Sequence, residues 1–343
     1  MLEYFPWSKQ ERSKCLELYK NGKLSILDIE LGGECNYNCV YCDSPDRKKI
    51  SNLSIDKIEQ LMKTGDFRWV YICGLGEPTF NKNYTNLLSI LQLCDVYGLK
   101  CSVFSNISNL TEELMKYINK HILYILFKYD TQYVSLAKTL YGTRSPNEQL
   151  NSINKLKSLI YLEKGTTNIA ASIVPTQLNY KEILNIVKDC IDSNIFPLLG
   201  ELELSGKGKT NYENLSLNPM ELKLLKKEVE KICETEYVIP ICPAVMNGIH
   251  INNCSNVTVD SFSGLSCHWF WLQEPKTESL TSFDKEADTQ LITNKIFDYR
   301  KKHLNDVSDY LQSYSRIGDA FGGCGGDIKN LFKEYLKIHR VIK

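Results

Sequence analysis

Short apolar runs alternate with longer amphipathic stretches over the first two thirds of the chain. The runs have the length and composition of strands, whereas the stretches between them repeat apolar positions with helical spacing. The predicted strands are residues 24–31, 69–73, 100–104, 123–127, 168–174 and 196–204, and the predicted helices are residues 55–63, 84–97, 111–120, 146–162 and 180–193. This series of strand–helix units predicts an α/β fold, a partial (β/α)6 barrel of parallel strands with right-handed crossovers.

The alternation stops after residue 208, and this change divides the chain. A helical stretch, 219–233, leads to two strand-like runs, 248–252 and 256–260, which predict a small hairpin. The predicted parts are an N-terminal helical extension (1–23), the barrel core (24–208), a linker helix (209–238) and a C-terminal region with the hairpin and further helices (239–343). Because active-site residues of such barrels gather at the carboxyl ends of the strands, we expect the chemistry to lie there.

Charge and hydropathy exclude two classes of partner. The 343 residues include 41 Lys or Arg and 41 Asp or Glu, so the formal net charge is zero, and no long basic run marks a nucleic-acid-binding surface. Residues 1–14 carry charges where a signal peptide needs an apolar core, and apolar runs such as 122–127 are too short to span a bilayer. We expect a soluble cytoplasmic protein that binds neither nucleic acid nor membrane.

Thirteen cysteines without a secretion signal are typical of a reducing compartment, in which clustered thiols more often bind metal or do redox chemistry than form disulfides. Three of them, Cys35, Cys39 and Cys42, lie in the stretch ECNYNCVYCDS directly after the first predicted strand. Soft thiolates select zinc, copper(I) or an iron–sulfur cluster. A closed zinc site needs a fourth ligand and none lies nearby, while a redox dithiol at Cys39 and Cys42 leaves Cys35 unexplained. The spacing favours a clamp of three cysteines with one open metal position.

These three cysteines, with Tyr41 just before the last, resemble the cluster motif of the radical S-adenosylmethionine (SAM) enzymes. The resemblance implies a 4Fe–4S cluster held by Cys35, Cys39 and Cys42, with SAM chelating the fourth iron through its amino and carboxylate groups. In that family an electron from the cluster breaks the sulfonium bond of SAM and leaves a 5'-deoxyadenosyl radical, which removes a hydrogen atom from the substrate. In this interpretation, the metal position that the three cysteines leave open is the one that SAM occupies.

A second motif follows the second predicted strand, in YICGLGEPTF. Gly74, Gly76, Glu77 and Pro78 resemble the GGEP element of the same enzymes, with Leu75 in place of one glycine. The resemblance implies that these residues bind SAM, since glycines let the backbone approach a ligand closely and a carboxylate can pair with the methionine ammonium group. An ordinary turn at the end of a strand would also explain this stretch if it stood alone.

Residues near the ends of later strands are further candidates. Ser105 and Asn106 end the third strand, where these enzymes often place polar residues near the ribose, and Ile173 in the fifth strand is a candidate adenine contact. Alternating isoleucines are equally ordinary strand core. Glu201 and Glu203 share one face at the end of the sixth strand and are candidate catalytic residues for substrate contact or proton handling, unless they are simply solvated.

Two smaller groups belong with these candidates. Residues 128–130 end the fourth predicted strand and are candidate SAM contacts. Tyr37 and Tyr41 lie among the cysteines, where they either shield the cluster or pack as ordinary core.

Four cysteines of the C-terminal region resemble the ligands of the hairpin module called SPASM, or of its shorter twitch version: Cys242, Cys254, Cys267 and Cys324. The resemblance implies one auxiliary 4Fe–4S cluster beside the predicted hairpin. The region has too few closely spaced cysteines for a second auxiliary cluster. A zinc ion on the same four thiolates, or a set of buried structural thiols, would also satisfy the pattern.

The resemblance implies an enzyme that oxidises, dehydrogenates or epimerises a carbon centre, with a flavodoxin- or ferredoxin-type protein as electron donor. The segment before the first strand is too short for a separate leader-binding domain, which favours a small polar substrate such as a sugar, an aminocyclitol or a nucleoside-like intermediate. A peptide maturase that cross-links, forms thioethers or epimerises is the alternative. A non-catalytic iron–sulfur or zinc protein on the same fold is a third interpretation.

Overall fold

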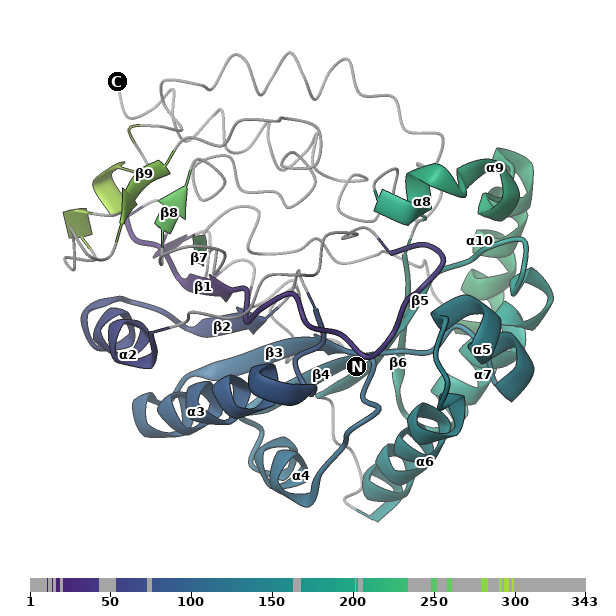
Figure 1. The fold of residues 1–343 in the computed structure, drawn as a ribbon, viewed down its shortest axis with the longest axis horizontal. Coiled ribbons are helices and arrows are strands. Elements are labelled where there is room, and N and C mark those ends of the chain that lie inside the picture. The colour runs from purple at the N-terminus through teal and green to yellow at the C-terminus, as the bar shows by residue number, and fades with distance from the viewer. Residues whose placement is uncertain are drawn as a thin grey trace.

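The computed structural model describes most of the barrel region and short parts of the C-terminal region: residues 11, 14, 17–18, 21–42, 54–72, 76–162, 168–200, 202, 206–233, 248–251, 258–260, 279–282, 290–291, 293–295 and 298. Within this part, seven parallel strands form one sheet in the order β6-β5-β4-β3-β2-β1-β7 (Figure 1). They are β1 (Ile26–Ile29), β2 (Trp69–Ile72), β3 (Lys100–Ser105), β4 (Leu123–Lys128), β5 (Ile169–Ile173), β6 (Phe196–Leu199) and β7 (Gly248–Ile251).

The sheet curls without closing. Among the described residues, β6 and β7 are its two edge strands and do not pair with each other. Strands β1 to β6 lie side by side in chain order, as expected when each strand is followed by a crossover that returns to the next position. The predicted partial barrel of parallel strands is confirmed.

Helices line the outer side of the curved sheet (Figure 1). The helices of the described residues are α2 (Ile55–Thr64), α3 (Asn81–Tyr97), α4 (Glu112–Asn119), α5 (Val134–Tyr141), α6 (Pro146–Leu162), the 3-10 turn η1 (Tyr180–Glu182), α7 (Ile183–Asp192), α8 (Gly206–Thr210), α9 (Tyr212–Leu215) and α10 (Pro219–Cys233), of which α8 and α9 lie beyond the carboxyl ends of the strands. The sequence pattern missed α5, α8 and α9, of which α8 and α9, with five and four residues, are too short to show helical periodicity. No helix in the described ranges is long and apolar enough to cross a bilayer.

Both faces of the sheet are buried, and alternation along the strands assigns side chains to one face or the other. Leu27 and Ile29 of β1 belong to the large core between the sheet and the helices. Ile26 belongs instead to a smaller cluster with Trp69 and Tyr124 on the opposite, concave face. Burial on both faces explains why the strands consist of nearly continuous apolar runs.

The predicted C-terminal hairpin is wrong in its pairing. The structure pairs β7 with β1 in parallel, with Leu27 opposite Ile249, so the first hairpin strand extends the barrel sheet. The second, β8 (Thr258–Asp260), pairs with the antiparallel β9 (Ser279–Ser282). An exposed edge of β1 would leave a row of backbone N–H and C=O groups unpaired, and β7 satisfies that edge from a distant part of the sequence. The remainder of the predicted auxiliary-cluster module lies outside the described residues.

Glu11 ties the N-terminal segment to the start of β2. Its buried carboxylate accepts hydrogen bonds from Trp69 Nε1 at 3.1 Å, from Arg68 Nη2 at 3.0 Å and from Lys14 Nζ at 2.8 Å. Burial alone would raise the pKa of Glu11, but the hydrogen bonds from Lys14, Trp69 and Arg68 outweigh it and lower the pKa to about 2. Folding therefore stabilises the ionised form of this carboxyl group.

Replacing Glu11 by Gln should lower the free energy of unfolding at pH 7 by about 2 kcal/mol, because two charged partners lose their carboxylate. A carboxyl group with a depressed pKa contributes its full stability above its ordinary pKa of 4.5 and loses it as the pH falls towards about 2. The difference between wild type and Glu11→Gln in urea unfolding should therefore shrink from about pH 5 to about pH 3.

The control for this measurement is Asp66→Asn, which removes an exposed ion pair of 3.1 Å with Lys23. We expect it to change the free energy of unfolding by less than about 0.5 kcal/mol at either pH. A Glu11→Gln difference that stays constant over the same pH range would contradict the assignment of a depressed pKa to Glu11.

Candidate active site

The loop that follows β1 carries three cysteines, and residues 31–42 are called the cysteine loop below. The Cys39 side chain is buried, and those of Cys35 and Cys42 are half-buried. In the part of the chain that the structure describes, no three Cys, His, Asp or Glu side chains are gathered closely enough to hold a metal. The three thiols share one short loop at the carboxyl end of β1.

The turn after β2 packs directly against the backbone of the cysteine loop. The Glu77 N–H donates to Glu34 O at 2.8 Å, and Asn83 Nδ2 donates to Gly32 O and Glu34 O, both at 3.2 Å. Gly76 has a φ of 79°, and a Cβ added there would lie 2.1 Å from Gly32 O. Only glycine allows this conformation and this approach, so the two sequence motifs meet through main-chain contacts.

The end of α5 holds the middle of the cysteine loop. The N–H groups of Asn38 and Val40 donate to the carbonyl oxygens of Tyr141 at 2.8 Å and Leu140 at 2.9 Å. Gly142, with a φ of 55°, ends the helix at a point where a Cβ would lie 2.6 Å from Asn38 O. The C-terminal carbonyls of a helix lack partners within the helix, and here the loop supplies donors to two of them.

Helices α8 and α9 hold the end of the cysteine loop. The Lys207 N–H donates to Cys42 O at 2.8 Å, and Asn211 Nδ2 donates to Val40 O at 2.7 Å. The Lys207 ammonium group also hydrogen-bonds to Asn38 Oδ1. These contacts join segments up to 171 positions apart, and no sequence motif marked Lys207 or Asn211.

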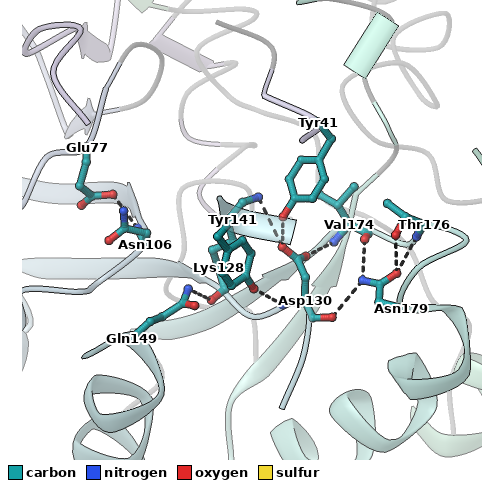
Figure 2. Close-up of polar contacts among 10 residues, drawn as sticks. All are labelled: Tyr41, Glu77, Asn106, Lys128, Asp130, Tyr141, Gln149, Val174, Thr176 and Asn179. Carbon is teal, nitrogen blue, oxygen red and sulfur yellow. Dashed lines mark hydrogen bonds and ion pairs between the residues drawn. The ribbon is translucent and has the colours of Figure 1, made fainter. Parts of the chain in front are cut away.

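Glu77 is buried, with 3% of its surface exposed, and its carboxylate holds the end of β3. Oε1 accepts hydrogen bonds from Thr79 N–H, Thr79 Oγ1 and Ser105 Oγ at 3.0, 2.7 and 2.5 Å, and Oε2 accepts the Asn106 N–H at 2.7 Å (Figure 2 shows Glu77 with Asn106). Burial raises the pKa of Glu77 above its ordinary value, although the hydrogen bonds from Asn106, Ser105 and Thr79 oppose this rise. Ser105 and Asn106 thus meet Glu77, as expected of residues at neighbouring strand ends.

Asn36 adds a link that sequence patterns did not indicate. Its Nδ2 donates to Ser108 Oγ at 2.7 Å, and its Oδ1 accepts from Asn106 Nδ2 at 2.9 Å. The cysteine loop is thereby fastened to the segment after β3 as well as to the turn after β2. The only signal in the sequence is the position of Asn36 directly after Cys35.

Asp130, two residues after β4, contacts the cysteine loop from the other side (Figure 2). Its Oδ2 accepts the hydroxyl of Tyr41, and its Oδ1 accepts the Val174 N–H at 2.6 Å. Lys128 Nζ lies 3.6 Å from Asp130 Oδ2 and 4.5 Å from the centre of the Tyr41 ring. The Asp130 N–H donates to Tyr141 Oη at 2.8 Å. Lys128 and Asp130, which the sequence marked together with Tyr129 as candidate SAM contacts, therefore contact the loop itself, whereas the Tyr129 hydroxyl donates to Asp189 of α7.

Three tyrosines, Tyr37, Tyr41 and Tyr141, pack in one cluster with the buried Cys39. Tyr37 stacks on Tyr141 with ring centres 5.6 Å apart, and both belong with Tyr41 to one apolar cluster. Burial, followed by the charge of Asp130, raises the pKa of Tyr41 and of Tyr141 well above the ordinary value. Their hydroxyl groups stay protonated at neutral pH, so the Tyr41 hydroxyl is a donor to Asp130.

Residues 29–190 match the model of the Radical SAM superfamily. The chain carries a radical SAM domain. The match identifies the protein as an enzyme. The matched segment contains the cysteine loop, the turn at Gly76 and Glu77, and the Asp130 network. No curated protein sequence matches the chain.

Solved structures share the fold of this chain. The crystal structure of Streptococcus suis SuiB bound to its precursor peptide SuiA superposes with a TM-score of 0.58 at 16% identity, covering 85% of this chain and 70% of that one. SuiB bound to S-adenosylmethionine gives 0.57 at 18% identity, with 79% and 67% covered. Native anSMEcpe with bound AdoMet and the Cp18Cys peptide gives 0.58 at 15% identity, with 93% and 100% covered.

The donor set of the radical SAM domain fits an iron–sulfur cluster. Three thiol side chains on one loop are the soft ligands that such clusters require, and main-chain contacts hold this loop in place. Cys94, Cys101 and Cys190 are fully buried in the core between the sheet and the helices.

The remaining predicted site residues fall into two groups. Pro78 is buried beside Glu77, whereas Ile173 lies in the large core between the sheet and the helices. Its neighbour Val174, on the other face of the chain, packs against the cluster that contains Cys39. The other predicted residues lie outside the described residues: Gly74, Glu201, Glu203, Cys242, Cys254, Cys267 and Cys324.

Proposed function

We propose that the protein is a radical SAM enzyme that cleaves SAM reductively and removes a hydrogen atom from a carbon centre of its substrate. Cys35, Cys39 and Cys42 hold a 4Fe–4S cluster in this proposal. The observation that carries it is the packing of the cysteine loop against the turn at Gly76 and Glu77, within a matched radical SAM domain. When bound together, cluster and SAM supply one-electron chemistry that yields methionine and a 5'-deoxyadenosyl radical.

Residues of this chain then hold SAM and exclude water. The described residues give Glu77 Oε2 one hydrogen bond, from Asn106 N–H, which leaves a lone pair for the ammonium group of SAM. Gly76 and the predicted Gly74 let the backbone approach the ligand, and Ser105 and Asn106 lie at the same strand end for contacts to the ribose. Tyr37 and Tyr41 cover the cysteine loop with apolar rings, which limits access of water to a cluster there.

The substrate class has two candidates. The first is a small polar molecule such as a sugar, an aminocyclitol or a nucleoside-like intermediate, which would be oxidised, dehydrogenated or epimerised. A peptide is the second candidate, because two solved structures of this fold, SuiB and anSMEcpe, hold peptides. Glu201 and Glu203 are proposed to contact the substrate or handle its proton in either case.

An auxiliary 4Fe–4S cluster on Cys242, Cys254, Cys267 and Cys324 completes the proposal. Such a cluster can accept the electron that remains on a substrate radical, which suits a net two-electron oxidation. A flavodoxin or ferredoxin is the proposed donor of the electron that starts the reaction.

The test uses anaerobically reconstituted protein. It should be brown, contain about seven to eight irons per chain, and release 5'-deoxyadenosine from SAM when reduced. Deuterium carried into 5'-deoxyadenosine from a labelled sugar, nucleoside or peptide would identify the substrate class and the abstracted position. Colourless protein that binds zinc and never cleaves SAM would overturn the proposal in favour of a non-catalytic metal protein.

A further inference from the structure

Two groups of the same chemical composition lie on opposite sides of the chain at the end of β4. The loop triad consists of Tyr41, Asp130 and Lys128, and the helix triad consists of Tyr129, Asp189 and Lys157. In each triad the tyrosine hydroxyl donates to the aspartate, and the lysine contacts that aspartate while lying over the tyrosine ring, at 4.5 Å from the ring centre in the first and 5.2 Å in the second. Only the loop triad includes a residue of the cysteine loop.

Asp130 is held in place independently of the cysteine loop. It is fully buried, and its Oδ1 and its N–H are fixed by Val174 N–H and by Tyr141 Oη. Its carbonyl oxygen accepts Asn179 Nδ2 at 2.9 Å, and the same Nδ2 donates to Val174 O at 3.0 Å. Asn179 Oδ1 in turn accepts the N–H of Thr176 at 2.7 Å (Figure 2). The carboxylate is therefore a fixed point joined to the ends of β4 and β5.

Tyr41 is the part of the cysteine loop that meets this fixed point. It directly precedes Cys42 and follows Cys39 by two positions. Its hydrogen bond to Asp130 therefore restricts the conformations that the backbone between these two cysteines can adopt. Hydrogen bonds from a hydroxyl to a buried carboxylate are among the stronger ones in proteins. The hydroxyl is thus well suited to hold this part of the loop against the strand ends.

We propose that Asp130 is a positioning residue for SAM cleavage, which acts by holding the Tyr41 hydroxyl and so fixes the segment from Cys39 to Cys42 against the ends of β4 and β5. The proposal rests on the proposed function, because it concerns the cluster that these cysteines hold. It assigns to Asp130 no contact with SAM or substrate. The consequence is that loss of one hydroxyl group changes the surroundings of the cluster.

The experiment compares Tyr41→Phe with Tyr129→Phe in the full, anaerobically reconstituted chain. Both variants remove one tyrosine–aspartate hydrogen bond, which is buried at Tyr41 and partly buried at Tyr129, and both keep the ring, so both should lose thermal stability. Only Tyr41→Phe should change the electron paramagnetic resonance spectrum of the reduced cluster. It should also weaken equilibrium binding of radiolabelled SAM about tenfold, whereas Tyr129→Phe should stay within about twofold of wild type.

Asp130→Asn provides a second measurement. The amide keeps an acceptor for Val174 N–H and a donor for Tyr41 Oη, so SAM binding should fall less than in Tyr41→Phe. In the Tyr41→Phe background, the same change should have little further effect on SAM binding, because the two residues act through one contact.

Equal spectra and equal SAM affinities in Tyr41→Phe and Tyr129→Phe would overturn the inference and leave Asp130 with a structural role only. A larger loss of SAM binding from Asp130→Asn in the Tyr41→Phe background than in wild type would overturn it too. A wild-type chain that takes up no iron or binds no SAM would overturn the proposed function, and this inference with it.

Discussion

Replacing any one of Cys35, Cys39 and Cys42 by Ala will abolish the release of 5'-deoxyadenosine from SAM, by at least ~100-fold. Each thiolate is expected to hold one iron, and the loop offers no replacement ligand for a missing one. Chromatographic detection of 5'-deoxyadenosine and iron content per chain are the two measurements. Iron should fall by about four per chain in each variant.

The matched control is Cys233→Ala. Cys233 is half-buried like Cys35 and Cys42, but it lies at the end of α10, and burial raises the pKa of its thiol. A cysteine of this kind is a core side chain, so cleavage and iron content should match wild type. A Cys39→Ala variant that retained full iron and cleavage would contradict the assignment of the cluster to the cysteine loop.

If the auxiliary cluster is present, we expect Cys242→Ala and Cys267→Ala to affect SAM cleavage differently from the three variants of the cysteine loop. If these residues bind only the second cluster, their variants should lose about four irons yet still release 5'-deoxyadenosine in the absence of substrate. Loss of SAM cleavage together with the irons would contradict the separation into two clusters.

The second large effect is expected from Gly76→Ala. The backbone conformation at a φ of 79° costs an L-residue about 1 to 2 kcal/mol, and the added Cβ would lie 2.1 Å from Gly32 O and 2.6 Å from Glu34 O. These oxygen atoms belong to backbone that cannot turn aside, so the turn after β2 must separate from the cysteine loop. We expect a loss of about 3 kcal/mol in the free energy of unfolding and a reduced yield of cluster after reconstitution.

Gly98→Ala is the control for this effect. Gly98 has a φ of 66° at the end of α3, but a Cβ added there would meet no atom within 4 Å. It should cost about 1 kcal/mol and leave cluster uptake unchanged. If both variants were equally unstable and both took up a full cluster, the close contact between turn and loop would have no bearing on the site.

Local pattern in the sequence was enough for the sheet and for the two motifs. Continuous apolar runs in the sequence identified β1 to β6. A strand within a parallel sheet is buried on both faces and therefore has no polar face. The spacing of Cys35, Cys39 and Cys42, and the Gly76-Glu77-Pro78 turn one strand later, pointed to the same edge of that sheet. Those conclusions need only neighbouring residues and the direction of parallel strands.

The pairing of the last strands could not be predicted in this way. The runs at 248–252 and 256–260 have the composition of strands, but composition does not indicate which other strand each of them will pair with. The structure places β7 against β1, more than two hundred positions earlier, because the edge of the sheet offers it a complete ladder of hydrogen bonds.

By itself, the sequence determined the order of β1 to β6, and it predicts the thiol ligands and the SAM-binding turn, since each follows from short-range spacing. Only the tertiary structure decided what holds the cysteine loop. Tyr41 and Asp130 lie 89 positions apart, Asn36 and Ser108 lie 72 apart, and Val40 and Asn211 lie 171 apart. Such partners are polar residues of ordinary composition, and they meet because the carboxyl ends of parallel strands and the following helices converge on one edge of the sheet.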